Sequence, residues 1–211
     1  WDIVWESLGE TLYMVGISGV IAGVLGVILG VILLITDENG LMPHHFLYNT
    51  LDKLVNTFRS LPFIILLTLI YPITRLIVGT AIGTTAALVP LVVSTVPFYA
   101  RQIQNALLEV DSGVIEAAQA MGTSNLDIIF RVYLKEGLAS IIRVSAVTII
   151  NLIGLTAMAG AVGAGGLGNL AITRGYNRFQ TDVIFVATIL ILIIVFISQA
   201  IGNALVKKVS H

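Results

Sequence analysis

The chain has 211 residues, of which 57% are hydrophobic and only 11% are charged, and its mean hydropathy is +0.99. Soluble domains carry about 25% charged residues, so this composition excludes an ordinary soluble protein. The net charge of −1 favours no class of partner, and because the chain lacks cysteine it gives no sign of its redox compartment.

Charged residues are absent from long stretches of the chain. No Asp, Glu, Lys or Arg occurs in residues 11–35, 76–100, 144–173 or 183–206. A bilayer core needs about 20 apolar residues of helix. The sequence therefore predicts an all-α integral membrane protein, one domain over residues 1–211, with five transmembrane helices at about 12–35, 61–78, 80–100, 138–162 and 183–205.

The first predicted span follows three acids, Asp2, Glu6 and Glu10. A signal peptide begins with basic residues and has a shorter apolar core, so we expect this span to be retained. Because the chain begins at Trp1, we also expect an initiator methionine to precede it in the encoded protein. Within the span, the glycine pairs Gly19-x-x-x-Gly23 and Gly26-x-x-x-Gly30 predict close contact with another helix.

Prolines mark the second and third predicted spans. Pro62 and Pro72 fall in the second, and Pro90 and Pro97 fall in the third. Proline removes a backbone N–H and clashes with the preceding turn, so we expect these residues to bend or break their helices.

The connection 101–137 is the longest hydrophilic segment, and its pattern predicts two short helices. Asp111 or Ser112 can cap the first, whose apolar residues recur at helical spacing: Val114, Ile115, Ala118 and Met121. Gly122 stands where a glycine commonly ends a helix. Ser124-Asn-Leu-Asp127 has the form of a capping box for the second helix, with an expected apolar stripe of Leu126, Phe130, Tyr133 and Leu134.

Two short helices at an angle have a shape that suits a groove on another protein. Helices that lie on a membrane surface favour a lysine-rich polar face. Here the charges are of both signs: Glu116, Asp127, Arg131, Lys135 and Glu136. The pattern therefore favours docking to a partner.

Residues 160–169, GAVGAGGLGN, show the G-x-G-x-x-G spacing of a dinucleotide-binding turn. Such a turn follows a strand and opens a long helix, whereas here a span-length apolar segment precedes it and Gly175 interrupts any helix after it. We interpret the spacing as coincidental. Small residues allow close helix packing, so we expect a tightly packed end of the span, a narrow passage, or both; the expected passage residues are Gly154, Ala157, Met158 and Ala161.

Lys and Arg predict the orientation of the chain. If the N-terminus is outside, inner segments hold eight Lys and Arg residues and outer segments hold three, Arg75, Arg174 and Arg178. Inner loops carry the excess of basic residues in membrane proteins. We therefore expect the N-terminus outside, and the 101–137 connection and the C-terminus in the cytoplasm.

The segment EAAQAMG, residues 116–122, with VYL at 132–134, resembles the EAA loop of ABC importer permeases. The resemblance implies the type I ABC importer permease fold and a cytoplasmic coupling loop at 112–135. It also implies coupling to an ATPase through Glu116, Ala117, Ala118, Gly122 and Leu134. Lys135 departs from the family, which usually has proline there.

Further segments are similar to the methionine-uptake branch of that family: FRSLPFIILL at 58–67, YPITRLIVGTAIG at 71–83, VPFYARQIQNALLEV at 96–110 and GAVGAGGLG at 160–168. This resemblance implies a homodimer in a bacterial cytoplasmic (inner) membrane. It further implies two cytoplasmic ABC ATPase subunits that hold ATP and Mg, and an external methionine-binding lipoprotein. We expect no cofactor on this chain and no nucleic-acid partner.

Other functions are less well supported by the sequence. The chain has no P-loop pattern, no metal-ligand spacing and no nucleophile motif, and the adjacent His44 and His45 are typical of a solvated turn. We therefore expect a transport subunit without catalytic residues. The alternatives are an ion-coupled carrier, a channel, or an ABC permease for another amino acid or small solute. The first is disfavoured because the predicted spans contain no acid.

Overall fold

The structure is a computed structural model that describes residues 1–209, so the last two residues of the predicted domain lie outside the described range. Within that range the regular elements are all helical. They are α1 (Asp2–Thr36), α2 (His45–Ser60), α3 (Phe63–Leu69), α4 (Tyr71–Val78), α5 (Thr84–Leu108), α6 (Ser112–Ala120), α7 (Asn125–Asp127), the π-helix η1 (Ile128–Tyr133), α8 (Leu134–Glu136), α9 (Leu138–Ala161), α10 (Gly166–Leu170), the π-helix η2 (Ala171–Tyr176) and α11 (Thr181–Val209).

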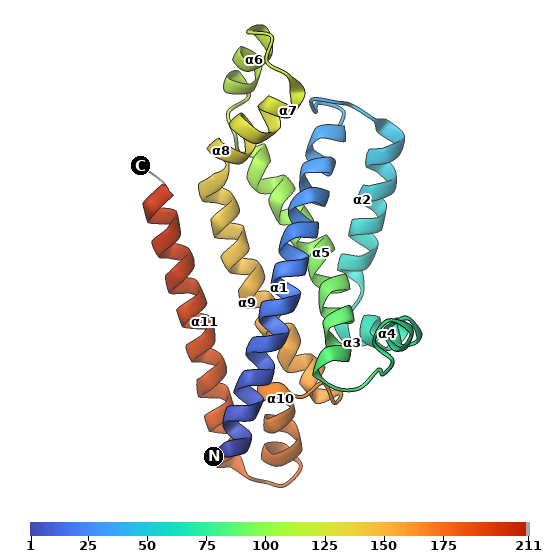
Figure 1. Cartoon of the computed structure of the whole chain (residues 1–211), viewed down its shortest axis with the longest axis vertical. Helices are drawn as coiled ribbons and strands as arrows, with labels where there is room; N and C mark the ends of the chain where they lie inside the picture. Colours follow the sequence, from blue (N-terminus) through green and yellow to red (C-terminus); the bar gives the residue numbers. More distant parts are fainter. Residues whose placement is uncertain (210–211) are drawn as a thin grey trace.

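Four long helices, α1, α5, α9 and α11, run along the long axis of the molecule (Figure 1). Each is long and apolar enough to cross a membrane. They match the predicted spans 12–35, 80–100, 138–162 and 183–205, but α1 and α11 extend beyond the predicted limits, and α5 begins four residues later than predicted and continues to Leu108, inside the predicted connection 101–137. The N-terminus and α10 lie at one end, here called the α10 end, and α6 to α8 lie at the other, here called the α6 end.

The second predicted span, 61–78, is wrong as a single helix. Pro62 directly precedes α3, Pro72 lies in the first turn of α4, and Gly79 ends α4 with a left-handed φ of 82°. Helix α2 was not predicted from the sequence; it starts at the α6 end and runs beside α5 (Figure 1). The chain therefore returns toward the α10 end through α2, α3 and α4 in series, with a proline at the start of both α3 and α4. Pro90 and Pro97 do not break their helix, since both lie inside the continuous α5.

The core contact between α1 and α5 depends on the predicted glycines. A Cβ at Gly26 would lie 2.6 Å from Cδ1 of Tyr99, and a Cβ at Gly30 would lie 2.6 Å from the carbonyl oxygen of Ala100. These two positions of α1 therefore confirm the predicted close helix contact. The other pair is less tightly packed, since a Cβ at Gly23 would meet nothing within 4 Å and one at Gly19 would be in ordinary contact, 3.6 Å from Cδ2 of Leu152 on α9.

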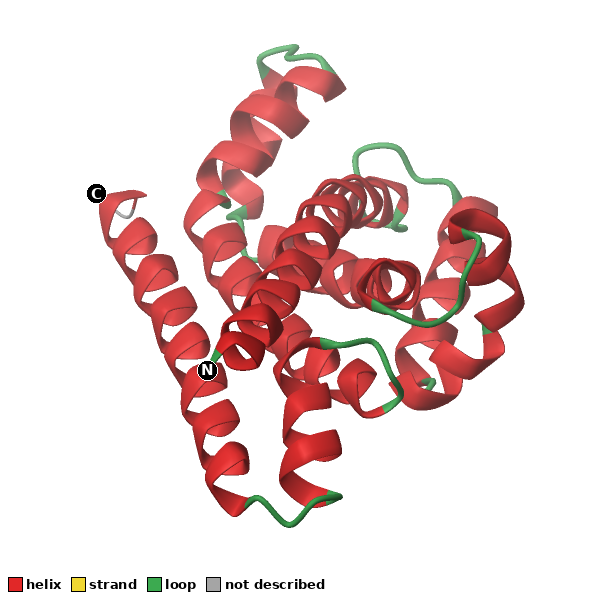
Figure 2. Cartoon of the chain, turned by 60° about the horizontal axis from the view of Figure 1, so that its bottom comes forward, coloured by secondary structure: helices red, strands yellow, loops and turns green. Residues whose placement is uncertain are grey.

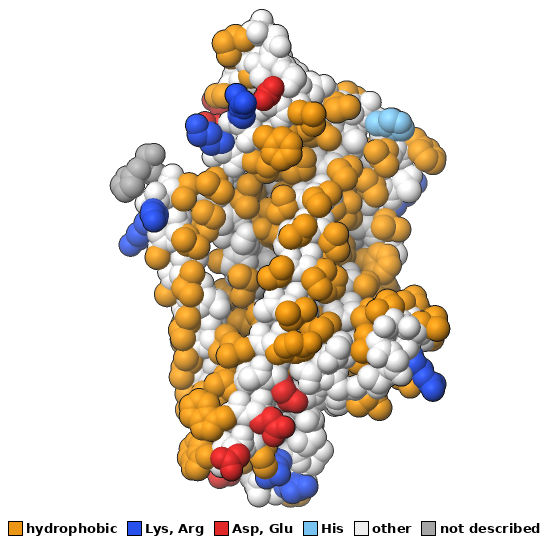
Figure 3. Space-filling view, viewed as in Figure 1, with side chains coloured by type: hydrophobic (Ala, Val, Ile, Leu, Met, Phe, Trp, Pro, Cys, Tyr) orange, Lys and Arg blue, Asp and Glu red, His pale blue; other side chains and the backbone are white. Residues whose placement is uncertain are grey.

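Hydrophobic side chains cover the middle of the visible surface, and the charged ones gather mainly toward its two ends (Figure 3). Helix α11 lies at the edge of the bundle (Figure 2), and only Ala187 and Gly202 of this helix are buried. An apolar surface of this kind suits a hydrocarbon environment rather than water.

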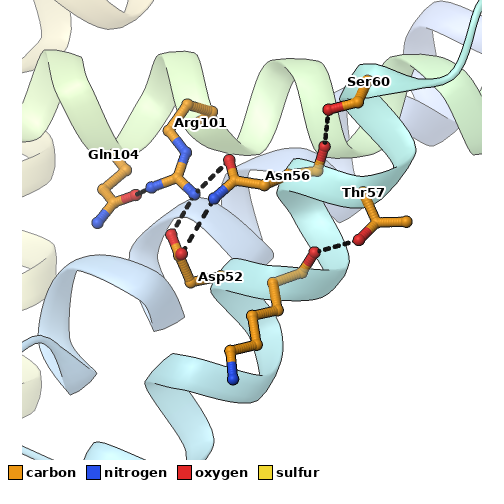
Figure 4. A network of polar contacts seen from close by, with 7 residues as sticks. Asp52, Asn56, Thr57, Ser60, Arg101 and Gln104 are labelled. Atoms are coloured by element: carbon orange, nitrogen blue, oxygen red, sulfur yellow. Dashed lines mark hydrogen bonds and ion pairs between the residues drawn. The ribbon is translucent and has the colours of Figure 1, made fainter.

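A polar network joins α2 to α5 (Figure 4). Arg101 on α5 forms an ion pair with Asp52 on α2, and its guanidinium also donates to Gln104 at 2.7 Å and to Asn56 at 3.2 Å. Asn56 in turn donates to Asp52 at 3.0 Å. Because the Arg101 side chain is only 14% exposed, its charge needs these partners, and the network fixes the middle of α2 against α5.

Candidate coupling and translocation sites

The two short helices predicted in the 101–137 connection project from the α6 end (Figure 1). Asp111 caps α6, because its Oδ1 accepts a hydrogen bond of 2.7 Å from the Gly113 N–H. Gly122 ends α6 with φ 77°. Its N–H donates to the Gln119 carbonyl at 2.9 Å, and the Thr123 N–H donates to the Ala118 carbonyl at 3.1 Å. This pair of bonds is a Schellman motif, and it confirms the predicted helix end.

The second predicted helix is a continuous helical segment with a π turn in its middle. Ser124 caps it, since the Asp127 N–H donates to Ser124 Oγ at 3.2 Å. The Ser124 hydroxyl donates to the Asp127 carboxylate at 2.7 Å. The predicted cap is therefore confirmed, whereas the wide turns of η1 between α7 and α8 were not predicted.

The predicted apolar stripe on this second helix is wrong in part. Leu126 and Phe130 are 67% and 66% exposed, while Ile128 and Ile129 are buried. Ile128 packs with Ile115 and Ala118 of α6 in one cluster, here called the coupling core. The π turns change the spacing from that of an α-helix, so a stripe counted at 3.6 residues per turn selects the wrong side chains.

The five predicted coupling residues do not share one surface. Glu116 and Ala117 are exposed on α6 and Gly122 is exposed at its end, whereas Ala118 is buried in the coupling core and Leu134 is half-buried. Four apolar side chains of α6, α7 and η1 and the turn between them are also exposed: Val114, Met121, Leu126 and Phe130. Burial also raises the pKa of the Tyr133 hydroxyl, which packs against the coupling core and stays neutral at physiological pH.

Three of the four predicted passage residues lie on one open face of α9. Gly154, Met158 and Ala161 are exposed, and a Cβ at Gly154 would meet nothing within 4 Å. Ala157 is half-buried and its backbone packs closely on α10, because a Cβ at Gly168 would overlap its carbonyl oxygen and lie 2.6 Å from its Cα. Ala157 therefore contributes to the packing of α9 against α10.

The glycine-rich turn before α10 surrounds a carboxylate of this chain. The Gly166 N–H donates to Oε2 of Glu10 at 2.6 Å, and Thr84 donates to Oε1 of Glu10 at 3.3 Å. A Cβ at Gly165, where φ is 83°, would lie 2.7 Å from the same carboxylate. The glycines thus allow α1, α5 and α10 to meet at Glu10, and this agrees with a packing role rather than a dinucleotide site.

Residues 22–211 match the family described as the binding-protein-dependent transport system inner membrane component. This match covers more than half of the chain. The chain belongs to that family.

Curated relatives of this permease cover almost its whole length. It is 46% identical over 210 residues to the "Probable D-methionine transport system permease protein MetI" of Vibrio cholerae, covering 100% of this chain and 93% of the relative. It is 49% identical over 200 residues to the "Methionine import system permease protein MetP" of Bacillus subtilis, covering 95% and 90%.

A solved structure has the same fold as the permease. It is described as "Inward facing conformations of the MetNI methionine ABC transporter", and the TM-score is 0.97 at 41% identity over 100% of this chain and 98% of that chain. The all-helical type I permease fold expected from the sequence is therefore confirmed, and the chain is a transport subunit of a membrane protein family rather than an enzyme.

Sequence reasoning missed a polar face on α2 of the permease. Only Val55 of this helix is buried. The exposed polar residues on one side are Asn49, Thr50, Lys53, Asn56, Thr57 and Ser60. The recurrence of polar residues at 49, 53, 56 and 60 is a signal that could have revealed this face.

The depth of α2 makes its polar face significant. Leu54, Val55 and Phe58 share an apolar groove of about 270 Å³ with residues from the middle of α1 and α5: Leu25, Leu29, Val92, Val93, Val96 and Pro97. The second half of α2 is therefore level with the middle of two membrane-spanning helices. A polar surface at this depth needs water or protein beside it, because hydrocarbon offers no hydrogen bonds.

Proposed function

We propose that this chain is the transmembrane subunit of an ATP-binding-cassette importer for methionine. Two copies form the translocation path, two cytoplasmic ATPase subunits bind ATP and Mg, and an external methionine-binding lipoprotein delivers the cargo. The observation that carries this proposal is the full-length similarity to the MetNI methionine transporter structure, at TM-score 0.97. ATP-dependent methionine uptake by vesicles that contain the reconstituted complex tests it.

The exposed outer face of α6 and α7 supports coupling to the ATPase. Glu116 and Ala117 are accessible on α6, and Met121, Leu126 and Phe130 are exposed apolar side chains of the same segment. Apolar side chains surrounded by polar ones are typical of a docking surface. Within this segment, 112–135, Ala118 and Leu134 act from inside by holding the helices in place, and Gly122 sets the angle between them.

We propose that the N-terminus lies outside the cytoplasmic (inner) membrane and that the α6 end and the C-terminus face the cytoplasm. The excess of Lys and Arg in the predicted inner segments supports this orientation. A docking surface for a cytoplasmic ATPase must also lie on that side.

The orientation predicts opposite labelling of the two ends of α11. Phe179, just before α11, is 91% exposed, and Lys208 is exposed at its other end. Since the chain has no cysteine, Phe179→Cys and Lys208→Cys each introduce a single thiol. In intact cells a membrane-impermeant thiol reagent should label position 179 alone, and position 208 should react only after the membrane is opened. The reverse pattern would contradict both the orientation and the docking surface.

We propose that the open face of α9 and the polar face of α2 line the path. The α9 face combines small residues, Gly154 and Ala161, with the half-exposed amide of Asn151 and the thioether of Met158. An amide in lipid is unfavourable, so this face is better suited to a narrow passage. A zwitterion nevertheless needs partners for both charges, and this supports tight recognition on the external lipoprotein rather than on the permease.

A large side chain at Gly154 should block this path. Because a Cβ at Gly154 meets nothing within 4 Å, Gly154→Trp is expected to fold, to bind the ATPase and to lose nearly all methionine uptake. Gly16→Trp is the matched control, since Gly16 of α1 is also exposed with open space around it. Wild-type uptake by Gly154→Trp, measured with radiolabelled methionine, would show that this face does not line the path.

A further inference from the structure

The loop between α1 and α2 lies against the coupling core. Leu41 of this loop packs on the cluster of Ile115, Ala118 and Ile128. A cavity of about 280 Å³ separates the rest of the loop from α6, with Asn39, Gly40 and Leu41 on one side and Ser112, Glu116 and Gln119 on the other. Leu41 therefore connects the loop to the coupling core by an apolar contact, while the cavity separates other parts of the loop from α6.

This loop is firmly attached to the helices on either side of it. The Met42 N–H donates to the Ile35 carbonyl at 2.8 Å, and the His44 N–H donates to the Thr36 carbonyl at 3.0 Å. A Cβ at Gly40 would lie 2.5 Å from the Ile35 carbonyl oxygen, so the loop folds closely onto the end of α1. His44 also caps α2, since its Nδ1 accepts from the Leu47 N–H at 3.2 Å. The end of α1 and the start of α2 are therefore both joined to Leu41 through this loop, so a displacement of Leu41 reaches the start of α2 through His44.

Helix α2 is held at a second point by the ion pair of Asp52 with Arg101. The seven residue steps from His45 to Asp52 span about 10 Å of helix. The coupling segment is covalently continuous with α5 and α9, whereas α2 meets the coupling core only through the preceding loop. If the coupling segment moves relative to α5, the start of α2 follows Leu41 while its middle stays at Arg101, and α2 tilts.

We propose that Leu41 is a positioning residue that transmits movement of the coupling helices to the tilt of α2. The proposal rests on the proposed importer function, because that function supplies the movement. Close-packed contacts transmit displacement since they do not compress. Leu41 thereby links ATP-driven movement at the α6 end to the polar face of α2. Because Leu41 lies in the loop between α1 and α2, replacing it leaves the proposed ATPase-binding surface of α6 and α7 unchanged.

The first test removes the Leu41 contact. Leu41→Ala should lower methionine uptake by about fivefold, within the range known for residues that couple distant sites. Association with the ATPase and the rate of ATP hydrolysis should stay close to wild type, and Leu41→Met should restore uptake. Met42→Ala is the matched control, because Met42 is the next residue, is 51% exposed and lies outside the coupling core. If Leu41→Ala lost ATPase association, ATP hydrolysis and uptake together, Leu41 would have only a structural role and the proposal would be overturned. Unchanged uptake by Leu41→Ala would overturn it as well.

The second test replaces the lost contact by a covalent link. Leu41 and Gln119 line the same cavity, and the chain has no cysteine of its own. Leu41→Cys with Gln119→Cys should show impaired uptake as free thiols, and a short thiol-to-thiol cross-linker should raise uptake toward wild type, because the loop and α6 move together. Each single-cysteine variant treated with the same reagent is the control. Arrest by the cross-link, or no gain, would overturn the proposal. Wild-type protein in the same vesicles tests the importer function separately. Only a lack of methionine uptake by the wild-type protein would count against that function.

Discussion

Replacing Gly122 by valine is expected to lower methionine uptake by about tenfold or more while the protein remains in the membrane. Gly122 has φ 77° and a Cβ there would meet nothing within 4 Å, so the effect comes from the backbone and not from a clash. An L-residue in this conformation costs about 1–2 kcal/mol, and valine is stiffer than most. The Schellman motif then opens, and α7 no longer leaves α6 at the same angle. Since 1.4 kcal/mol is about a tenfold change in an equilibrium constant, this backbone cost is sufficient for the expected tenfold loss of uptake.

The matched control at this position is Gly122→Asn, because asparagine tolerates the left-handed conformation that ends helices. Uptake, ATP hydrolysis and association of the ATPase are measured for both variants in the same preparation. The valine variant should lose association or hydrolyse ATP without uptake, while the asparagine variant stays near wild type. Equal, full transport by both would mean that the angle between α6 and α7 does not matter for coupling.

Replacing Gly168 by alanine is expected to destabilise the protein strongly. The added Cβ would overlap the Ala157 carbonyl oxygen and lie 2.6 Å from the Ala157 Cα. Backbone atoms cannot rotate away, so α9 and α10 must separate, at a cost of about 1–3 kcal/mol or more. For a chain of this size each kcal/mol lowers the melting temperature by about 2–4 °C.

Gly154→Ala on the same helix as Ala157 supplies the contrast. Its Cβ would meet nothing within 4 Å, and alanine in a helix interior is favoured over glycine by about 1 kcal/mol. Thermal unfolding in detergent should therefore show a clear loss for Gly168→Ala and no loss for Gly154→Ala. Similar melting temperatures for the two variants would show that the close contact of α9 with α10 is not important for stability.

The parts of the fold that could be predicted were those with a local cause. Four spans were evident from the absence of charge over long apolar stretches, and α9, at Leu138–Ala161, lies within one residue of the predicted 138–162. Gly122 and Ser124 were correctly placed at helix ends, because caps depend on a few neighbouring residues. Such signals are contained within one turn of helix.

The parts that could not be predicted depend on contacts between distant segments. Pro62 and Pro72 break the 61–78 segment as expected, but nothing in the sequence showed that Pro90 and Pro97, expected to act in the same way, would lie inside one continuous helix, α5. The π turns of η1 place Ile128 rather than Leu126 in the coupling core, and no pattern at α-helical spacing reveals this. The backbone of Ala157 is approached closely by Gly168, eleven residues later in the chain, and the sequence does not show which backbone atoms meet.

Methionine uptake by proteoliposomes that contain this chain, its ATPase and its external binding protein tests the importer assignment most directly. Radiolabelled methionine should accumulate only when ATP and Mg are present on the side of the ATPase, and Gly122→Val should lower that accumulation by about tenfold or more while Gly122→Asn supports it. Accumulation driven by a proton or sodium gradient without ATP, or its absence with all three components and ATP present, would contradict the assignment of this chain as an ABC methionine permease.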